Sequence, residues 1–187
     1  VFFFFFEKSL RGILLIAIPV AVCGIIVAPQ LISFLFGAEY APTTLTLRLL
    51  LSTVILVFPS SLFSNALFAH DKQKSFLKLL ALGAVSNALL NWLLIPRFGI
   101  EGAAWATIGS QLLSTFFVWA LMQRTVKFNW TRGFMRALAA TLLTAIFCAG
   151  ILSLGAPILA NVFASIAVYG LLLIILKEPL TISGLKL

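Results

Sequence analysis

The sequence has few charged residues and few of the residue types that form catalytic or metal sites. Charged residues make up 10% of the chain, against about 25% in a typical soluble domain. So few charges cannot cover a water-facing surface, which excludes a soluble globular protein. His70 is the single histidine and Asp71 the single aspartate. Without more metal ligands or a pair of membrane carboxylates, the sequence predicts no enzyme, no metal site and no cofactor.

Cysteine is also scarce, and the chain does not begin with methionine. Cys23 and Cys148 both fall in apolar stretches, where a free thiol behaves as a small hydrophobic side chain. We therefore interpret them as packing residues and not as a disulfide or metal pair. The opening residues, Val1 followed by five phenylalanines, resemble the end of a preceding segment. We expect an N-terminal lobe to be missing from this sequence.

Hydrophobic residues are abundant and occur in long runs. They make up 62% of the chain, and the mean hydropathy is +1.16. A bilayer core of about 30 Å needs about 20 apolar residues in a helix. Six segments meet this requirement: roughly 12–35, 43–69, 75–96, 102–123, 134–154 and 157–176. The sequence therefore predicts an all-α integral membrane protein with six transmembrane helices, forming a single transmembrane lobe over residues 1–187.

The basic residues are distributed unevenly between the two predicted sides of the membrane. One side holds Lys8, Arg11, Lys72, Lys74, Lys78, Arg124, Lys127, Arg132, Arg136, Lys177 and Lys186. The other side holds Arg97, and Arg48 lies just inside the membrane. The positive-inside rule predicts a multi-pass protein of the cytoplasmic (inner) membrane with both termini in the cytoplasm. The net charge of +8 then reflects topology and contacts with membrane lipids, and we expect no nucleic-acid partner.

Arg48 is the strongest candidate for a substrate-pathway residue. It follows Pro42 by six positions, which places it about 9 Å into its helix. An ionisable group within a span is costly and usually faces a cavity or a partner. Arg48 could hold a pyrophosphate or an anionic sugar during passage. The alternative is that its long side chain reaches the outer interface without a role in transport.

Two prolines within predicted spans are candidate hinges. Pro19 lies in the first span and Pro59 in the second, and each removes a backbone hydrogen bond and allows a kink. Such kinks could absorb the bending that opens and closes a transporter. They could equally be static bends, with the freed carbonyls satisfied by neighbours such as Ser60 or Ser61.

The most informative stretch runs from 87 to 110 and predicts a helical hairpin. An apolar helix with Asn87 and Asn91 one turn apart is expected to stop at Pro96. Gly99 permits the chain to reverse, and a second helix begins at Gly102. Asn65, Asn87, Asn91 and Gln111 are candidate pathway residues, although such amides more often join helices in lipid. Gly102, Ala106, Ser110 and Ser114 form a small-residue stripe that we interpret as a packing seam.

The hairpin pattern N-x3-N-x2-LIP-x2-G-x2-GAA-x-AT resembles the lipid-linked polysaccharide flippases of the multidrug/oligosaccharidyl-lipid/polysaccharide exporter superfamily. Phe36-Gly37-Ala38-Glu39-Tyr40 is similar to the family's segment after its seventh helix. The resemblance covers roughly residues 12–124 and implies the C-terminal half of a two-lobed exporter, beginning at the seventh helix. It also implies that Arg48 lies on the eighth helix, which is expected to line the cavity.

This resemblance implies translocation of a lipid-linked oligosaccharide or polysaccharide precursor by alternating access. The implied partners are an undecaprenyl-type lipid-linked glycan and either the missing N-terminal lobe or a second copy of the chain. Two alternatives stay open. One is a multidrug or cation antiporter of the same superfamily, which more often needs a membrane carboxylate. The other is a non-transporting membrane fragment.

Overall fold

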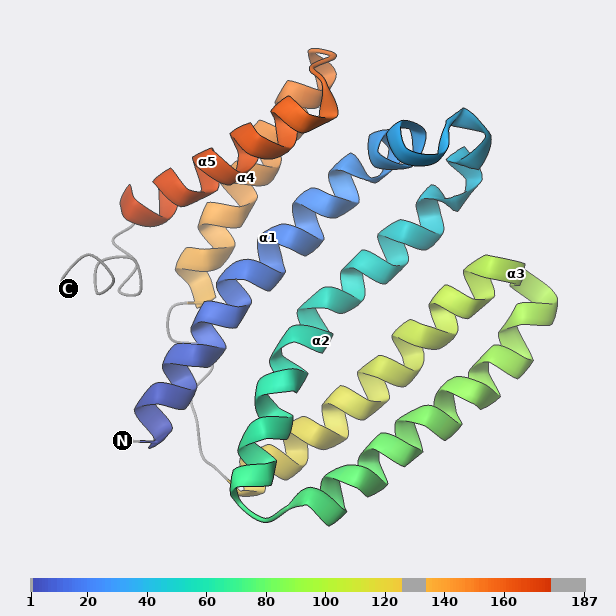
Figure 1. Ribbon diagram of the computed structural model, residues 1–187, viewed down its shortest axis with the longest axis vertical. Coiled ribbons are helices and arrows are strands. Elements are labelled where there is room, and N and C mark those ends of the chain that lie inside the picture. The colour runs from blue at the N-terminus through green and yellow to red at the C-terminus, as the bar shows by residue number, and fades with distance from the viewer. Residues whose placement is uncertain (1, 126–133, 176–187) are drawn as a thin grey trace.

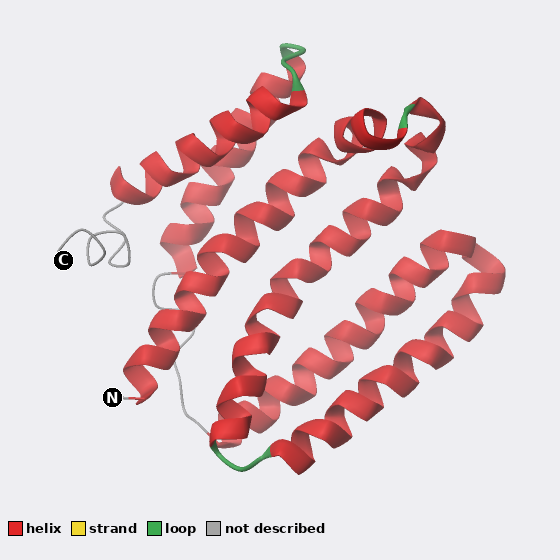
Figure 2. Ribbon diagram, in the orientation of Figure 1, coloured by secondary structure: helices red, strands yellow, loops and turns green. Residues whose placement is uncertain are grey.

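The computed structural model describes residues 2–125 and 134–175, and this part of the chain is almost entirely helical. Its elements are α1 (Phe2–Phe36), the 3-10 helix η1 (Ala38–Thr43), α2 (Thr44–Ala69), α3 (Gln73–Thr125), α4 (Phe134–Ser153) and α5 (Ile158–Ile175). Only short turns interrupt the helices of these two ranges (Figure 2). The predicted all-α class is therefore confirmed.

Helix α1 lies at the centre of the arrangement. It packs against α2 on one side and against α4 and α5 on the other, while α3 packs against α2 (Figure 1). One hydrophobic core joins α1, α2 and α3 through Phe6, Leu10, Phe63, Ala66, Leu67, Val118 and Met122. A second core joins α1 to α4 and α5 through Leu15, Ala137, Ala140 and Leu173. The direction of α1 therefore sets the relation between the two sides of the molecule.

Helix α1 begins at Phe2, about ten residues before the predicted span. The side chains at its start have partners in the protein. Phe6 is buried and stacks on Phe63 of α2, with ring centroids 6.2 Å apart. Leu10 is buried one turn later. Packing against α2 extends the helix beyond the length that a bilayer alone requires.

The break predicted at Pro96 lies instead at Gly99. The backbone stays helical through Pro96, and Gly99 is the non-helical residue within α3, with φ 55° and ψ −132°. Proline removes one hydrogen bond but keeps a helical φ, whereas a reversal needs a positive φ that glycine adopts without strain. Two arms, 73–98 and 100–125, result, each about 39 Å long. The predicted hairpin is confirmed, but its first helix does not stop at the proline.

Four helices in the described residues are long and apolar enough to cross a membrane: α1, α2 with η1, α3 and α5. The apolar stretch Ala137–Ser153 of α4 is shorter. Since α3 folds into two arms, the helices follow the six predicted segments closely. The count of six membrane crossings itself stays a prediction.

The described charges gather at the two ends of the helices. The start of α1 and the α2–α3 turn lie at one end, and η1 and the Gly99 kink lie at the other (Figure 1). Lys8, Arg11, Lys72, Lys74, Lys78 and Arg124 belong to the first end, and Arg48 and Arg97 to the second. The side chains of Lys127, Arg132, Arg136, Lys177 and Lys186 are outside the described residues. The orientation in the membrane stays a prediction.

Candidate functional site

The small-residue stripe of α3 is a packing seam, as predicted. A Cβ atom added at Gly102 would collide with the Leu94 carbonyl of the opposite arm, and one added at Gly83 would collide with the Ser114 hydroxyl. Ala106 is fully buried between them. Each contact pairs positions whose numbers sum to 196 or 197, which is the register of an antiparallel hairpin. The backbones approach closely because these side chains are small.

Asn87 joins the two arms at the centre of this seam, and Asn91 bonds Asn87 within the first arm. The Asn87 side chain donates to the Ser110 hydroxyl at 3.0 Å. The Asn91 amide donates to the Asn87 side-chain oxygen at 2.9 Å and to the Asn87 carbonyl at 3.0 Å. Both amides are therefore engaged within the hairpin. The Asn87 bond matches the interhelical interpretation, whereas Asn91 bonds within its own arm. The place of both residues on a substrate pathway stays a prediction.

Gln111 bonds Thr115 within the second arm of α3, and Thr115 connects this arm to α2 next to Pro59. The Gln111 amide donates to the Thr115 hydroxyl at 3.3 Å, and Thr115 shares a hydrogen bond of 3.3 Å with Ser60. Ser60 also donates to the Leu56 carbonyl at 2.7 Å. Pro59 has no N–H, so the carbonyl of Ile55 loses its helical donor. Ser60 does not bond this carbonyl; it bonds the carbonyl of Leu56 and the Thr115 hydroxyl of α3.

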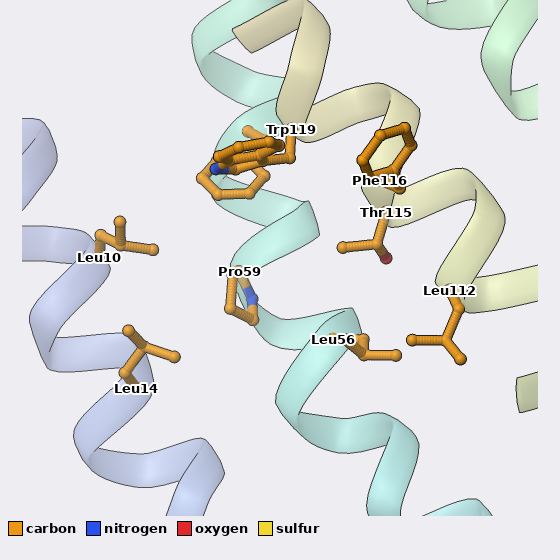
Figure 3. Close-up of a pocket in the computed structure, with 9 residues that line it drawn as sticks. Leu10, Leu14, Leu56, Pro59, Leu112, Thr115, Phe116 and Trp119 are labelled. Carbon is orange, nitrogen blue, oxygen red and sulfur yellow. The ribbon is translucent and has the colours of Figure 1, made fainter. Parts of the chain in front are cut away.

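Pro59 also lines an apolar cavity of about 340 Å³ between α1, α2 and the second arm of α3 (Figure 3). Its lining is Leu10, Leu14, Leu56, Pro59, Phe63, Leu112, Thr115, Phe116 and Trp119. Thr115 contributes the hydroxyl of this set, and that hydroxyl already bonds Ser60. Such a surface offers contacts to hydrocarbon and almost no hydrogen bonds to a sugar.

Arg48 points toward the backbone of α1. Its Nε donates to the Ile25 carbonyl at 3.1 Å. That carbonyl lacks its usual helical donor, because residue 29 is a proline without an N–H. The guanidinium has five N–H donors, so four remain on an exposed side chain. Arg48 thus combines a fixed position with spare capacity to bind an anion.

The face of α2 that carries Arg48 also carries Pro59. Eleven residues separate them, which is about three helical turns and about 16 Å. A cation and an apolar cavity therefore lie along one side of the same helix, next to α1. Asn65 is exposed farther along α2, about 25 Å from Arg48. The candidate residues thus form separate groups, and no single site unites them within the described ranges.

Sequence analysis did not identify two residues that matter for α1: Pro29 within the helix and Tyr169 of α5, which contacts it. Pro29 was not predicted as a source of a free carbonyl, and Tyr169 of α5 was not predicted to have a role. The Tyr169 hydroxyl donates to the Leu15 carbonyl at 2.7 Å, across 154 positions of sequence. Because a proline lacks the N–H that bonds the carbonyl four residues before it, Pro29 and Pro19 could have identified the carbonyls of Ile25 and Leu15 as free. No local pattern could identify the donors.

Comparison with protein families assigns the chain. The family model described as lipid II flippase MurJ matches residues 5–176. The chain belongs to the MurJ lipid II flippase family. It is 30% identical over 116 residues to an uncharacterized membrane protein of Methanocaldococcus jannaschii, covering 62% of this chain and 23% of that protein. It also resembles a solved lipid II flippase MurJ in an inward closed conformation, with a TM-score of 0.81 and 18% identity.

These comparisons place the fold within the expected superfamily. The likeness to the solved MurJ covers 96% of this chain and 40% of that chain. The chain therefore spans less than half of the solved MurJ and about a quarter of the archaeal relative. The expected membership of the multidrug/oligosaccharidyl-lipid/polysaccharide exporter superfamily is confirmed, and a family of transporters agrees with the expectation that the chain is not an enzyme. The finer expectation of a polysaccharide flippase stays a prediction.

Proposed function

We propose that this chain forms one lobe of a flippase that carries a lipid-linked saccharide precursor across the cytoplasmic membrane by alternating access. The other lobe would come from a further segment or a second copy. Membership of the MurJ family supports the reaction class. Lipid II, the substrate in the family's name, and a lipid-linked oligosaccharide share an isoprenoid tail, a pyrophosphate and a sugar, so either fits this class.

The observation that carries the proposal is the composition of one face of α2. Arg48 retains four N–H donors that suit a pyrophosphate, and the cavity at Pro59 has an apolar lining that suits a hydrocarbon tail. Both are next to α1 and about 16 Å apart. A cation at one end of a span and an apolar pocket deeper along the helix match the division of a lipid-linked precursor into head and tail.

A proton- or sodium-coupled antiporter finds less support in the same residues. Such a transporter more often needs a carboxylate within the membrane. The acidic residues of the described part are Glu7, Glu39, Asp71 and Glu101, and each is close to an end of a helix or in a turn. The described spans therefore provide no carboxylate at mid-membrane depth.

The proposal is tested by replacing Arg48 and measuring translocation of a fluorescent isoprenoid-pyrophosphate-linked saccharide in proteoliposomes. We expect Arg48→Ala to lower the initial rate by roughly 10- to 100-fold, since a charge-assisted hydrogen bond contributes about 1.5–3 kcal/mol. Arg97→Ala is the matched control, because it removes an exposed cation from the same end. Equal rates for both variants at equal protein levels would refute the role of Arg48.

Two substrates in parallel separate the finer alternatives. Lipid II carries a disaccharide with a peptide, whereas an oligosaccharide precursor carries sugars alone. Competition of each unlabelled compound against the fluorescent substrate shows which head group the protein prefers. If neither compound competes and the unsubstituted protein does not translocate the fluorescent substrate, the lipid-flippase assignment for this lobe fails.

A further inference from the structure

Pro19 creates an unsatisfied carbonyl in the middle of α1. In an α-helix the carbonyl of residue i accepts from the N–H of residue i+4, and proline has no N–H. The carbonyl of Leu15 therefore has no donor within its own helix. An unsatisfied carbonyl is costly in hydrocarbon, where water does not reach. Some other group has to satisfy it.

Tyr169 of α5 provides the donor. Its hydroxyl donates to the Leu15 carbonyl at 2.7 Å, which is at the short end of the range for such bonds. The side chain is partly buried and packs on the core formed by Leu15, Ala137, Ala140 and Leu173. We propose that Tyr169 is a positioning residue, which sets the direction of α1 by bonding the carbonyl that Pro19 leaves free.

Packing leaves an open space beside α1 at Pro19. A second cavity of about 340 Å³ lies between α1, α4 and α5. Pro19 and Cys23 line it from α1, Cys148 from α4, and Ser165 and Tyr169 from α5. Since no side chain fills this space, α1 makes few van der Waals contacts along it. The Tyr169 hydrogen bond supplies a directional contact across this gap.

Two different helices therefore satisfy the two freed carbonyls of α1. Arg48 of α2 satisfies the carbonyl freed by Pro29, and Tyr169 of α5 satisfies the carbonyl freed by Pro19. The Tyr169 contact joins α1 to α5, whereas the Arg48 contact joins it to α2. Its effect on the direction of α1 holds whatever substrate the flippase carries, so it does not rest on the proposed function.

A double-mutant cycle tests the proposal with Tyr169→Phe, Pro19→Ala and their combination. Alanine at position 19 restores the N–H that Leu15 lacks, so the tyrosine hydroxyl should then matter little. We expect Tyr169→Phe to lower the unfolding midpoint in detergent by about 2–4 °C in the original background and by less than about 1 °C with Pro19→Ala. Tyr40→Phe is the matched control, since Tyr40 is the other tyrosine and is exposed.

Each result of the cycle decides the question. Equal losses of midpoint in both backgrounds would show that the hydroxyl acts through some group other than the Leu15 carbonyl, and no loss in either would show that it has no role. If Tyr169→Phe fails to fold, folding of the double variant supports the proposal. Failure of both variants would assign Tyr169 to general packing and overturn it.

A second measurement reports position and not stability. Cys23 lies one turn beyond Pro19, and it lines the same cavity as Cys148 of α4. Oxidation with copper phenanthroline should join the pair, at a rate that depends on how α1 is held. We expect Tyr169→Phe to slow the reaction by about threefold or more, and Tyr40→Phe to leave it unchanged. An unchanged rate in Tyr169→Phe would refute the positioning role.

Discussion

The hairpin α3 and the helix α1 are held in different ways. The two arms of α3 meet through backbone and small side chains, at Gly102 and Gly83, and through the Asn87–Ser110 hydrogen bond. Helix α1 packs through two hydrophobic cores, has a cavity on each flank, and has two proline-freed carbonyls that each accept from one side chain of α2 or α5. The hairpin is thus held by close contact between its arms, whereas each freed carbonyl of α1 depends on one side chain of another helix.

The largest effect should come from breaking the hairpin at its closest contact. Gly102→Ala places a methyl group against the Leu94 carbonyl, which belongs to the backbone and cannot rotate away. We expect a loss of about 2–3 kcal/mol in unfolding free energy, as overpacking costs in well-packed interiors. Denaturant titration in mixed micelles measures it.

Gly170→Ala is the control for this substitution. A Cβ atom at Gly170 of α5 meets nothing within 4 Å. The same change there should be neutral or stabilising by up to about 1 kcal/mol, because alanine favours a helix over glycine. Similar losses at the two positions would show that the α3 seam is not tighter than the rest of the molecule.

A smaller effect should follow from removing the amide at the centre of the seam. Asn87→Ala removes the donor to Ser110 and the side-chain acceptor for Asn91. We expect a cost of about 1–2 kcal/mol, the upper part of the range for polar contacts between membrane helices. Asn65→Ala is the matched control, since Asn65 is exposed on α2, and it should stay within about 0.5 kcal/mol of the parent.

The smallest effect should come from the contact between Gly83 and Ser114, which a second substitution can relieve. Gly83→Ala meets the Ser114 hydroxyl, which can rotate, so its net effect should be less than about 1 kcal/mol. Adding Ser114→Ala removes that oxygen. The double variant should then exceed the parent by up to about 1 kcal/mol through helix propensity. A double variant less stable than Gly83→Ala would contradict this account, and thermal unfolding distinguishes the two.

Much of the fold follows from local sequence. Runs of about 20 apolar residues predict the helices, and glycine at position 99 predicts the reversal of α3, because the required backbone angles favour that residue. The small-residue stripe predicts the seam, because small side chains let two backbones approach closely. The predicted site of the break was wrong by three residues because Pro96, although a helix breaker in isolation, keeps a helical φ.

The partners of α1 could not be predicted in this way. Pro19 and Pro29 identify which carbonyls lose their donors, but the donors lie on other helices, 154 and 23 residues away from Leu15 and Ile25. Which side chain reaches a freed carbonyl depends on how whole helices pack. The role of Arg48 was predicted as a choice between a cavity or partner and the membrane interface. Its hydrogen bond to the α1 backbone could not be predicted, and the choice itself stays a prediction.

The spacing of these contacts along the chain has a consequence for synthesis. The α3 pairs join residues 8, 23 and 31 positions apart, so the hairpin can close soon after its second arm emerges. Tyr169 lies in the last described helix and bonds Leu15 near the beginning. Because membrane proteins are made from the N-terminus onward, α1 stays without that bond until α5 is in place. The first helix of this sequence is therefore among the last to acquire its final orientation.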